Sequence, residues 1–221
     1  YLAAAGVGQL QIIDSEKLEV SNLHRQILYT TSDVGQFKAE AAARRLQALN
    51  PQIQCAAVCA KIQAANIDQF LGDQDLILEC SDSPRTKFLL NDYAVLHNRA
   101  LLIGGAIGWH GQVWWIQANS GACYRCLFPQ IPPADATPAC ASAGVMGPVV
   151  GLVACWMATL AMRYISAADN EHIKEPGLSL FDALGQPVMR SLNPGPARDC
   201  PLCGHEPTIH AILAENYELT Q

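Results

Sequence analysis

Apolar runs of strand length alternate with helical segments along the N-terminal half of the chain, and this alternation restricts the fold more than any other feature. The segments predicted as strands are 9–14, 53–60, 75–80 and 101–105, and those predicted as helices are 33–50, 65–71 and 84–98. Short connections between such elements are typical of an α/β fold with a doubly wound, mainly parallel Rossmann-like sheet and helices on both faces. Later runs at 111–118, 178–182 and 186–191 are predicted to continue the sheet as antiparallel strands.

The composition indicates a well-packed globular chain. Half of the 221 residues are hydrophobic and only 15% are charged, against about 25% charged in an average soluble domain. A chain of this length can bury a full core as one domain, so we expect a single domain over 1–221 and exclude disordered, coiled-coil and fibrous classes. The net charge of −6, without a run of Lys and Arg, argues against nucleic acid as a partner.

The start of the chain and its cysteines bear on location. Residues 1–8 include no initiator Met and resemble the tail of a helix that ends at Gly6 or Gly8. No basic stretch followed by an apolar one opens the sequence, and nine cysteines in a chain of this size do not resemble a small secreted disulfide scaffold. We therefore expect a reducing, cytoplasmic location.

One uncharged segment, 136–162, is long enough to cross a bilayer. Prolines and glycines interrupt its first half, among them Pro138, Gly147 and Pro148. The helix predicted at about 149–165 mixes small and large residues, which is typical of a helix enclosed by protein. We expect no membrane insertion.

Two Cys-x-x-Cys pairs, Cys123/Cys126 and Cys200/Cys203, are the most specific metal signal in the sequence. Four thiolates complete the tetrahedral shell of a zinc ion, which leaves no open position for a substrate and makes the site structural. An iron–sulfur cluster, a redox-active pair and no metal are the alternatives, and the coincidence of two pairs favours zinc. The zinc would staple the C-terminal segment to the middle of the domain, across 123–203.

Cys140 differs from the other cysteines. It lies in a Pro-Ala-Cys-Ala-Ser-Ala-Gly stretch, 138–144, ahead of the long apolar helix, where exposure and a helix N-terminus lower the pKa of a thiol. A nucleophile and a free loop thiol are equally compatible with this position. The cysteines expected to be small core residues are Cys55, Cys59, Cys80 and Cys155.

Acidic residues follow two of the predicted strands. Asp14 comes after the first and Asp82 after the third. Ligands of open α/β sheets bind beyond the carboxyl ends of the strands, and a carboxylate there can hold a ribose through two hydrogen bonds. A solvated turn for Asp14 and a helix N-cap at Asp82 or Ser83 are the plainer interpretations.

Together and in order, the motifs of this chain resemble the MoeB/ThiF/HesA adenylyltransferases, relatives of the ubiquitin-activating enzymes. The resemblance covers most of the chain and is carried by Ala-Gly-Val-Gly at 5–8, Ile-Ile-Asp at 12–14, Val-Ser-Asn-Leu-His-Arg-Gln at 20–26, Val-Gly-Gln-Phe-Lys at 34–38, Asn50-Pro51, Glu-Cys-Ser-Asp at 79–82, both cysteine pairs and Ala-Gly-Val-Met-Gly-Pro at 143–148. It implies that ATP and Mg²⁺ activate the C-terminal Gly-Gly carboxylate of a small ubiquitin-like sulfur carrier, of the MoaD or ThiS type, as an acyl-adenylate with release of pyrophosphate.

The resemblance also implies partners and site residues. It implies a homodimer that acts in molybdopterin, thiamine or a related pathway and, since no rhodanese-like domain follows Cys203, a separate sulfur donor. The nucleotide contacts that it implies are Asp14 to the ribose, Asn22, Arg25 and Lys38 to the phosphates with Gln26 beside them, and Asp82 to Mg²⁺. Cys140 matches a position that handles sulfur in some members only. The glycines of 104–108 match a passage near the entry of the carrier's tail, and close packing explains them equally well.

Two departures from the family pattern matter. The family's glycine-rich phosphate loop precedes a segment like 1–6, so we expect a first strand and this loop upstream of Tyr1, and little adenylation by the 221 residues alone. Glu79 and Ser83 stand where the family usually has Asp and Asn, which alters one contact near the nucleotide. A non-catalytic module that grips a ubiquitin-like partner is the main alternative function. A nicotinamide-dependent oxidoreductase is the third, and it explains neither the cationic residues nor the cysteine pairs.

Overall fold

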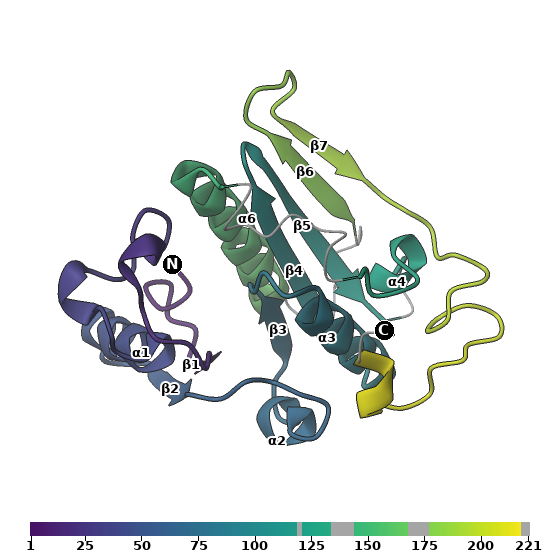
Figure 1. Ribbon diagram of the computed structural model, residues 1–221, viewed down its shortest axis with the longest axis horizontal. Coiled ribbons are helices and arrows are strands. Elements are labelled where there is room, and N and C mark those ends of the chain that lie inside the picture. The colour runs from purple at the N-terminus through teal and green to yellow at the C-terminus, as the bar shows by residue number, and fades with distance from the viewer. Residues whose placement is uncertain (119–120, 134–143, 168–176, 218–221) are drawn as a thin grey trace. The chain divides into compact units, whose positions relative to one another are not determined.

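The computed structural model describes residues 1–118, 121–133, 144–167 and 177–217. The chain divides into two compact units, an N-terminal unit, Tyr1–Ile62, and a C-terminal unit, Gln63–Gln221. Strands β1 and β2 pair in the first unit, and strands β3 to β7 form a five-stranded sheet in the second (Figure 1). The single domain expected over 1–221 stays a prediction.

The N-terminal unit is built on a parallel strand pair. Strand β1, Gln9–Ile13, runs beside β2, Gln54–Val58, with Gln9 opposite Gln54 at the start of the pairing. Helix α1, Lys38–Leu49, connects the two strands and buries a face of alanines, which are Ala39, Ala41, Ala42 and Ala43. These small side chains let the helix lie close to the strands, as expected for a strand–helix–strand unit.

Helix α1 begins five residues later than the predicted start at 33. Gly35 has a φ of 87°, a backbone conformation that interrupts the helix predicted to start at 33. Asp33 instead ends a short 3₁₀ turn, Thr31–Asp33, and its carboxylate accepts hydrogen bonds from the Thr30 amide, at 2.8 Å, and from Arg44 and Arg45. The predicted end at Asn50 is confirmed, since Asn50 caps the helix.

The first residues form a helical turn that ends at Gly6, as the sequence predicted. The amide of Val7 donates to the Leu2 carbonyl and that of Gly6 donates to the Ala3 carbonyl, each at 3.1 Å. With a φ of 85° at Gly6, these two bonds form a Schellman motif, the common glycine ending of a helix.

The five-stranded sheet has the order β3-β4-β5-β6-β7. Its strands are β3 at Leu76–Glu79, β4 at Ala100–Ile107, β5 at His110–Gln117, β6 at Leu178–Asp182 and β7 at Met189–Leu192. Only β3 and β4 pair in parallel, across the crossover helix α3, Pro84–Leu96, whereas each later pair is antiparallel. The described strands thus form a mixed α/β arrangement. Parallel pairing of the earlier strands and antiparallel pairing of the later ones are confirmed, and one doubly wound, mainly parallel sheet stays a prediction. Two residues between β4 and β5 are too few for a parallel crossover.

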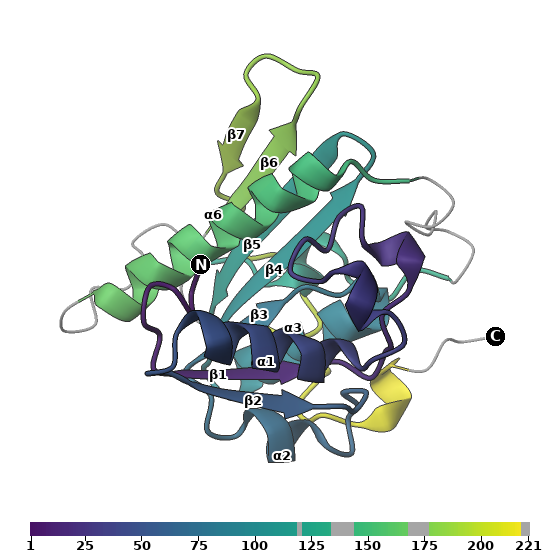
Figure 2. The same cartoon turned by 90° about the vertical axis from the view of Figure 1, so that its left-hand side faces the viewer.

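Helices cover both faces of this sheet (Figure 2). On one face, Trp114 of β5 contacts Tyr124, which also packs edge-on against Phe88 of α3. On the other face, Trp115 contacts Tyr164 of helix α6, Gly147–Ser166. Consecutive strand residues point to opposite faces, so the sheet lies between α3 and α6. A short helix α2, Ile67–Leu71, precedes β3 and ends at Gly72 as predicted.

Helix α6 is the one described helix whose length and composition would allow it to cross a membrane. Its buried side chains, among them Val153 and Met157, rest on β4 and β5, whereas Leu152 and Ile165 on its other side are exposed. The expectation of no membrane insertion stays a prediction. Its outer face exposes Cys155, and Cys59 and Cys80 are exposed at strand ends, so their expected role as core residues is wrong; Cys55 is half-buried.

Candidate functional site

Lys38 and Glu16 form an ion pair beside Asp14, beyond the carboxyl end of β1. The Lys38 ammonium lies 2.5 Å from Glu16 Oε2, and the Lys38 amide donates to the Glu16 carbonyl at 2.9 Å. The lysine side chain is 7% exposed, whereas that of Glu16 is 70% exposed. Asp14 Oδ1 accepts the Glu16 amide at 2.7 Å, so a solvated turn describes Asp14 in part. The lysine is thus held at a fixed place by an acid that water reaches freely.

The loop after β1 carries the other predicted phosphate contacts. Asn22 is buried, and its Oδ1 accepts the Glu19 amide at 3.2 Å, which stiffens the loop. Arg25 uses Nη1 alone, to the Ser21 carbonyl at 3.1 Å and to His24, so within the described residues its Nε and Nη2 have no hydrogen-bond partner. Gln26 Oε1 is buried without a partner in the described ranges. The unused guanidinium donors of Arg25 suit an acceptor such as a phosphate oxygen, whereas Gln26 Oε1 would need a hydrogen-bond donor.

Asp82 lies at the carboxyl end of β3, in the turn that leads into α3. The helix cap is Ser83, whose hydroxyl accepts the Thr86 amide at 3.3 Å, so the N-cap interpretation of Asp82 is wrong. The Asp82 side chain is exposed and has no hydrogen-bond or ion-pair partner among the described residues. Mg²⁺ in nucleotide sites is held by one or two carboxylates together with phosphate oxygens, and a free carboxylate at this edge fits that requirement.

A buried ion pair, Lys87 with Glu79, lies directly beneath this turn. Lys87 is 8% exposed and Glu79 is 1% exposed, and the ammonium contacts Glu79 Oε2 and donates at 2.8 Å to the carbonyls of Ser81 and Gly104. Burial raises the pKa of Glu79, and the Lys87 ammonium and the Ser81 hydroxyl and amide act against that rise. The three donors of the ammonium are all used by the protein, so none is left for a ligand.

The glycines at 104 and 111 have a packing reason. A Cβ at Gly104 would lie 2.4 Å from Met157 Sδ, and one at Gly111 would lie 2.5 Å from a Val153 methyl carbon. Helix α6 therefore packs so closely on β4 and β5 that a larger residue at either place would force the Met157 or Val153 side chain to shift. At Gly105 a Cβ would meet only the Gln112 side chain at 3.5 Å, an ordinary contact.

The four predicted metal ligands come together. The sulfur atoms of Cys123, Cys126, Cys200 and Cys203 all lie within 4.8 Å of one another, and the Cys123 sulfur is 3.8 Å from that of Cys126 and 3.6 Å from that of Cys200. Bonds of about 2.3 Å to a tetrahedral Zn²⁺ place sulfurs roughly 3.8 Å apart. Hydrogen bonding among the thiols, with Cys123 first, lowers the pKa of Cys203, whereas the pKa of Cys123 is raised by its hydrogen bond with Cys203 and that of Cys126 by burial.

A second link ties the end of the chain to the same region. Asp92, fully buried on α3, accepts both Nε, at 2.7 Å, and Nη2, at 2.7 Å, of Arg125, which lies within the first cysteine pair. Tyr217, in the last described turn, donates its hydroxyl to the same carboxylate at 3.0 Å. Bidentate Arg–carboxylate pairs are the strong, geometrically defined ones. This network holds the C-terminal segment independently of a metal.

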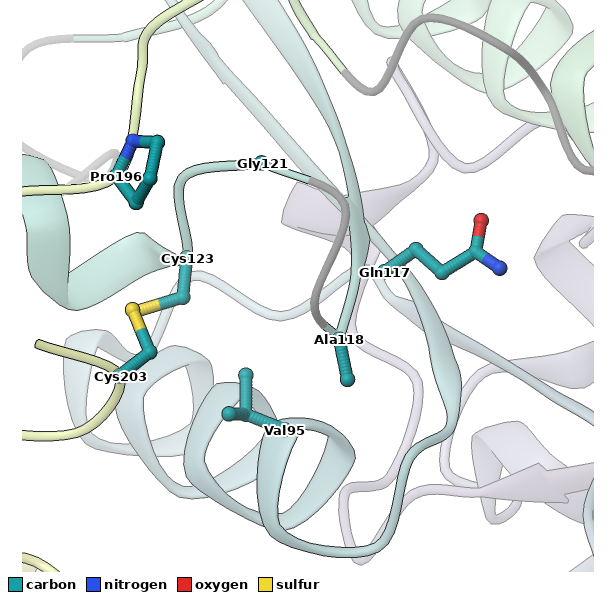
Figure 3. A pocket seen from close by; sticks show the side chains of 7 residues that line it. All are labelled: Val95, Gln117, Ala118, Gly121, Cys123, Pro196 and Cys203. Carbon is teal, nitrogen blue, oxygen red and sulfur yellow. The ribbon is translucent and has the colours of Figure 1, made fainter.

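A small hollow beside the cysteine cluster is not a nucleotide site. Its volume is about 170 Å³, and its walls include Val95, Gly121, Pro196 and the two cysteines Cys123 and Cys203. The two cysteine side chains point toward one another at its edge (Figure 3). Sites for drug-sized ligands occupy roughly 300–1,000 Å³, so this hollow is too small for ATP.

The structure thus brings together some of the predicted residues and adds others. Asp14 and Lys38 are near neighbours in the N-terminal unit, Asn22, Arg25 and Gln26 share one loop of that unit, Asp82 lies in the C-terminal unit, and Cys140 lies outside the described residues. Sequence reasoning missed Glu16, Lys87 and Asp92 as partners of these groups. An acid at the end of an apolar strand with a lysine in the first turn of the next helix, as with Glu79 and Lys87, was the available signal.

The fold and these sites define an α/β protein with polar groups beyond its parallel strands and a four-cysteine cluster. The model of the ThiF family matches residues 1–202. The chain belongs to the ThiF family, as its motifs indicated.

Two named relatives are similar to this chain over nearly its whole length. A sulfur carrier protein adenylyltransferase of Thermus thermophilus is 41% identical over 218 residues, which cover 96% of this chain and 79% of that protein. The adenylyltransferase and sulfurtransferase UBA4 of Meyerozyma guilliermondii is 36% identical, over 98% of this chain and 51% of that protein. The chain therefore spans about half the length of the UBA4 protein that it matches.

Solved structures support the fold. Escherichia coli MccB, crystallised with ATP, superposes with a TM-score of 0.76 at 22% identity, over 92% of this chain and 61% of MccB. A second MccB structure, with MccA-N7isoASN, gives 0.77 at 20% identity. At this level of identity the likeness establishes a common fold and no more.

Proposed function

We propose that this chain is the adenylation unit of an enzyme that activates the C-terminal carboxylate of a sulfur-carrier protein with ATP. The observation that carries the proposal is the 41% identity, over 96% of this chain, to a protein named sulfur carrier protein adenylyltransferase. The residues that such a reaction needs are present. Arg25 has unused donors and Asp82 has a free carboxylate among the described residues.

The reaction joins two anions, which determines what the residues must do. An oxygen of the carrier's carboxylate forms a bond to the α-phosphorus of ATP, the bond from that phosphorus to the β-phosphate oxygen breaks, and pyrophosphate leaves with the electron pair. A carboxylate is already ionised at neutral pH, so no general base is needed. The guanidinium fork of Arg25 and the point charge of Lys38 are proposed to offset the repulsion at the phosphates, and Asp14 to hold the ribose.

Two metals accompany this proposal. Asp82 is proposed to hold Mg²⁺, which when bound orients the triphosphate and withdraws charge from it. The four cysteines are proposed to hold a structural Zn²⁺, because their sulfur spacing fits a tetrahedral shell. Cys200→Ser is expected to lower both the zinc content and the midpoint of thermal unfolding, since structural zinc contributes folding energy. Cys155→Ser, on the exposed face of α6, serves as the control; unchanged zinc in Cys200→Ser would contradict the zinc site.

Further features of the proposal follow the family. The carrier is a small ubiquitin-like protein that ends in Gly-Gly, the enzyme is a cytoplasmic homodimer, and the sulfur donor is a separate protein. Molybdopterin and thiamine biosynthesis are both compatible pathways. A role for Cys140 in sulfur handling is left as a prediction.

Carrier-dependent exchange between ATP and radiolabelled pyrophosphate tests the function. The full-length protein is incubated with Mg²⁺, ATP and a carrier that ends in Gly-Gly, and the matched control is the same carrier without its last two residues. We expect exchange with the first carrier only. If carriers bind but none supports exchange, the chain is a non-catalytic module that grips ubiquitin-like proteins.

A further inference from the structure

A buried ammonium, that of Lys87, lies beneath the turn that carries Asp82. Lys87 lies in the first turn of α3, and helical side chains there point back toward the helix N-terminus. Its ammonium therefore reaches under the turn and meets three acceptors from three segments, which are Glu79 at the end of β3, Ser81 in the turn and Gly104 in β4. This one cation connects the carboxyl end of β3 to the middle of the neighbouring parallel strand β4.

The turn that carries Asp82 is held on both sides by this network. On its N-terminal side, Glu79 Oε1 accepts the amide of Ser81 at 2.9 Å and also its hydroxyl. On its C-terminal side, the amide of Ser83 donates to the Ser81 hydroxyl oxygen at 3.3 Å, and Ser83 in turn caps α3. Asp82 is thus the exposed member of a turn whose neighbours are bonded to one another, and its own carboxylate has no hydrogen-bond or ion-pair partner among the described residues.

The third acceptor, the Gly104 carbonyl, gives the network a rigid support. Gly104 lies against Met157 of α6 so closely that even a Cβ would collide, and β4 is fully buried around it, with Leu102 and Ile103 at most 1% exposed. Packed interiors have few alternative arrangements. The hydrogen bond from Lys87 to this carbonyl therefore ties the turn to the centre of the sheet, because the same ammonium also bonds the Ser81 carbonyl of the turn.

We propose that Lys87 is a positioning residue, which acts through Glu79, Ser81 and the Gly104 carbonyl to hold the β3–α3 turn so that Asp82 is presented to the magnesium ion of the nucleotide. This inference rests on the proposed function for the role of Asp82. The contacts of Lys87 with Glu79, Ser81 and Gly104 do not depend on that function, because they all lie within one unit. All three donors of the Lys87 ammonium bond to protein acceptors, so none is left to contact a substrate. Partners that orient a metal ligand from behind typically change metal affinity or activity by about 10- to 100-fold when removed.

The central experiment compares Lys87→Met with Lys87→Arg and with the double variant Glu79→Leu/Lys87→Met. The double variant removes both charges, because a buried acid left alone is costly whereas an apolar pair of similar volume is tolerated. Arg163→Met, at an exposed position on α6, is the control for loss of a positive charge. In all variants, amide hydrogen exchange over 80–86 is measured without any ligand, alongside carrier-dependent pyrophosphate exchange at several Mg²⁺ concentrations.

The inference predicts three results. The amides of 80–86 exchange faster in Lys87→Met and in the double variant, while those of 101–103 in β4 do not. The Mg²⁺ concentration for half-maximal activity rises ~10-fold or more, and Lys87→Arg, which keeps charge and donors, lies between these variants and the native protein. In an Asp82→Ala background the further loss caused by Lys87→Met disappears, because residues that act through one another are not additive.

Other results would overturn it. Unchanged amide exchange over 80–86 in the double variant would show that Lys87 does not hold the turn. Equal losses of activity with and without Asp82 would show that Lys87 acts elsewhere. If the native protein shows no carrier-dependent pyrophosphate exchange at all, the proposed function fails. The amide hydrogen exchange of 80–86 then still decides whether Lys87 holds the turn.

Discussion

The two units each contain a buried lysine paired with a glutamate, and the pairs differ in whether the glutamate is exposed. In the N-terminal unit, Lys38 is buried and its partner Glu16 is 70% exposed. In the C-terminal unit, Lys87 is 11% exposed over its side chain and its partner Glu79 is fully buried. Water can solvate the first acid when its lysine leaves it, whereas no water can replace Lys87 at the second acid.

This difference separates a lysine available to a ligand from one that holds structure. Glu16 stays hydrated when Lys38 leaves it, so breaking this pair is expected to cost little more than breaking a surface pair, roughly 0–1 kcal/mol, and an anion such as a phosphate can replace Glu16. A buried pair that loses one partner leaves a charge in a medium that cannot solvate it. The same two residue types therefore fit the proposed phosphate contact of Lys38 and the proposed positioning role of Lys87.

The largest expected effect is a difference in the free energy of unfolding between variants of the two lysines. Without that difference, the contrast between the two ion pairs would not hold. Lys87→Met leaves Glu79 buried and unpaired and is expected to lower the free energy of unfolding by about 3–5 kcal/mol. Lys38→Met leaves Glu16 in water and is expected to cost less than about 1 kcal/mol. Urea denaturation of both variants measures the difference. Similar losses for the two would show that exposure of the acid does not distinguish the pairs.

Activity is expected to show the opposite selectivity. Lys38→Ala is expected to reduce carrier-dependent pyrophosphate exchange at least ~100-fold, the size of a lost electrostatic contact to the reacting phosphates, while the protein stays folded. Lys17→Ala, an exposed neighbour of Glu16, is the matched control and should keep its activity. A near-native rate for Lys38→Ala would remove this lysine from the site.

A smaller effect is expected from the exposed acid. In Glu16→Gln the Lys38 ammonium no longer has to leave a carboxylate before it meets a phosphate, so the apparent KM for ATP should fall about two- to fivefold with kcat unchanged, in line with the energy of an exposed pair. Steady-state kinetics at saturating carrier measures both constants. A raised KM would mean that Glu16 orients Lys38 and does not compete with ATP.

The smallest effect is expected at Asp33, where the acid is buried and its arginine partners are more exposed, the reverse of the Lys38–Glu16 pair. This buried acid is bonded to Thr30, Arg44 and Arg45, and the Thr30 amide, together with the hydroxyl and Arg45, lowers the pKa of Asp33 to about 2. Its stabilising effect is therefore complete above the ordinary value of 3.8 and is lost as the pH falls through about 2. Asp33→Asn should lower the unfolding midpoint at pH 7, and the gap to the native protein should close between pH 4 and pH 2 in thermal scans. A gap that does not depend on pH would exclude this ionic contribution.

The sequence predicted most elements and the cysteine cluster, for identifiable reasons. Apolar runs such as Leu76–Glu79, and the Pro84 that starts α3, are local signals, and two cysteine pairs are specific by their spacing alone. The start of α1 was missed because a positive φ at Gly35 overrides the polar pattern. The pairings of Lys38 with Glu16 and of Arg125 with Asp92 join residues far apart in the chain, and no local pattern specifies such partners.

The most direct test of the account is the mass of the carrier protein after the reaction. The full-length enzyme, Mg²⁺, ATP and a Gly-Gly-ended carrier are incubated with pyrophosphatase, and the carrier is examined by intact-protein mass spectrometry. The account predicts a carrier heavier by one AMP with the native enzyme and an unmodified carrier with Lys38→Ala. A carrier that stays unmodified while the native enzyme consumes ATP would contradict it.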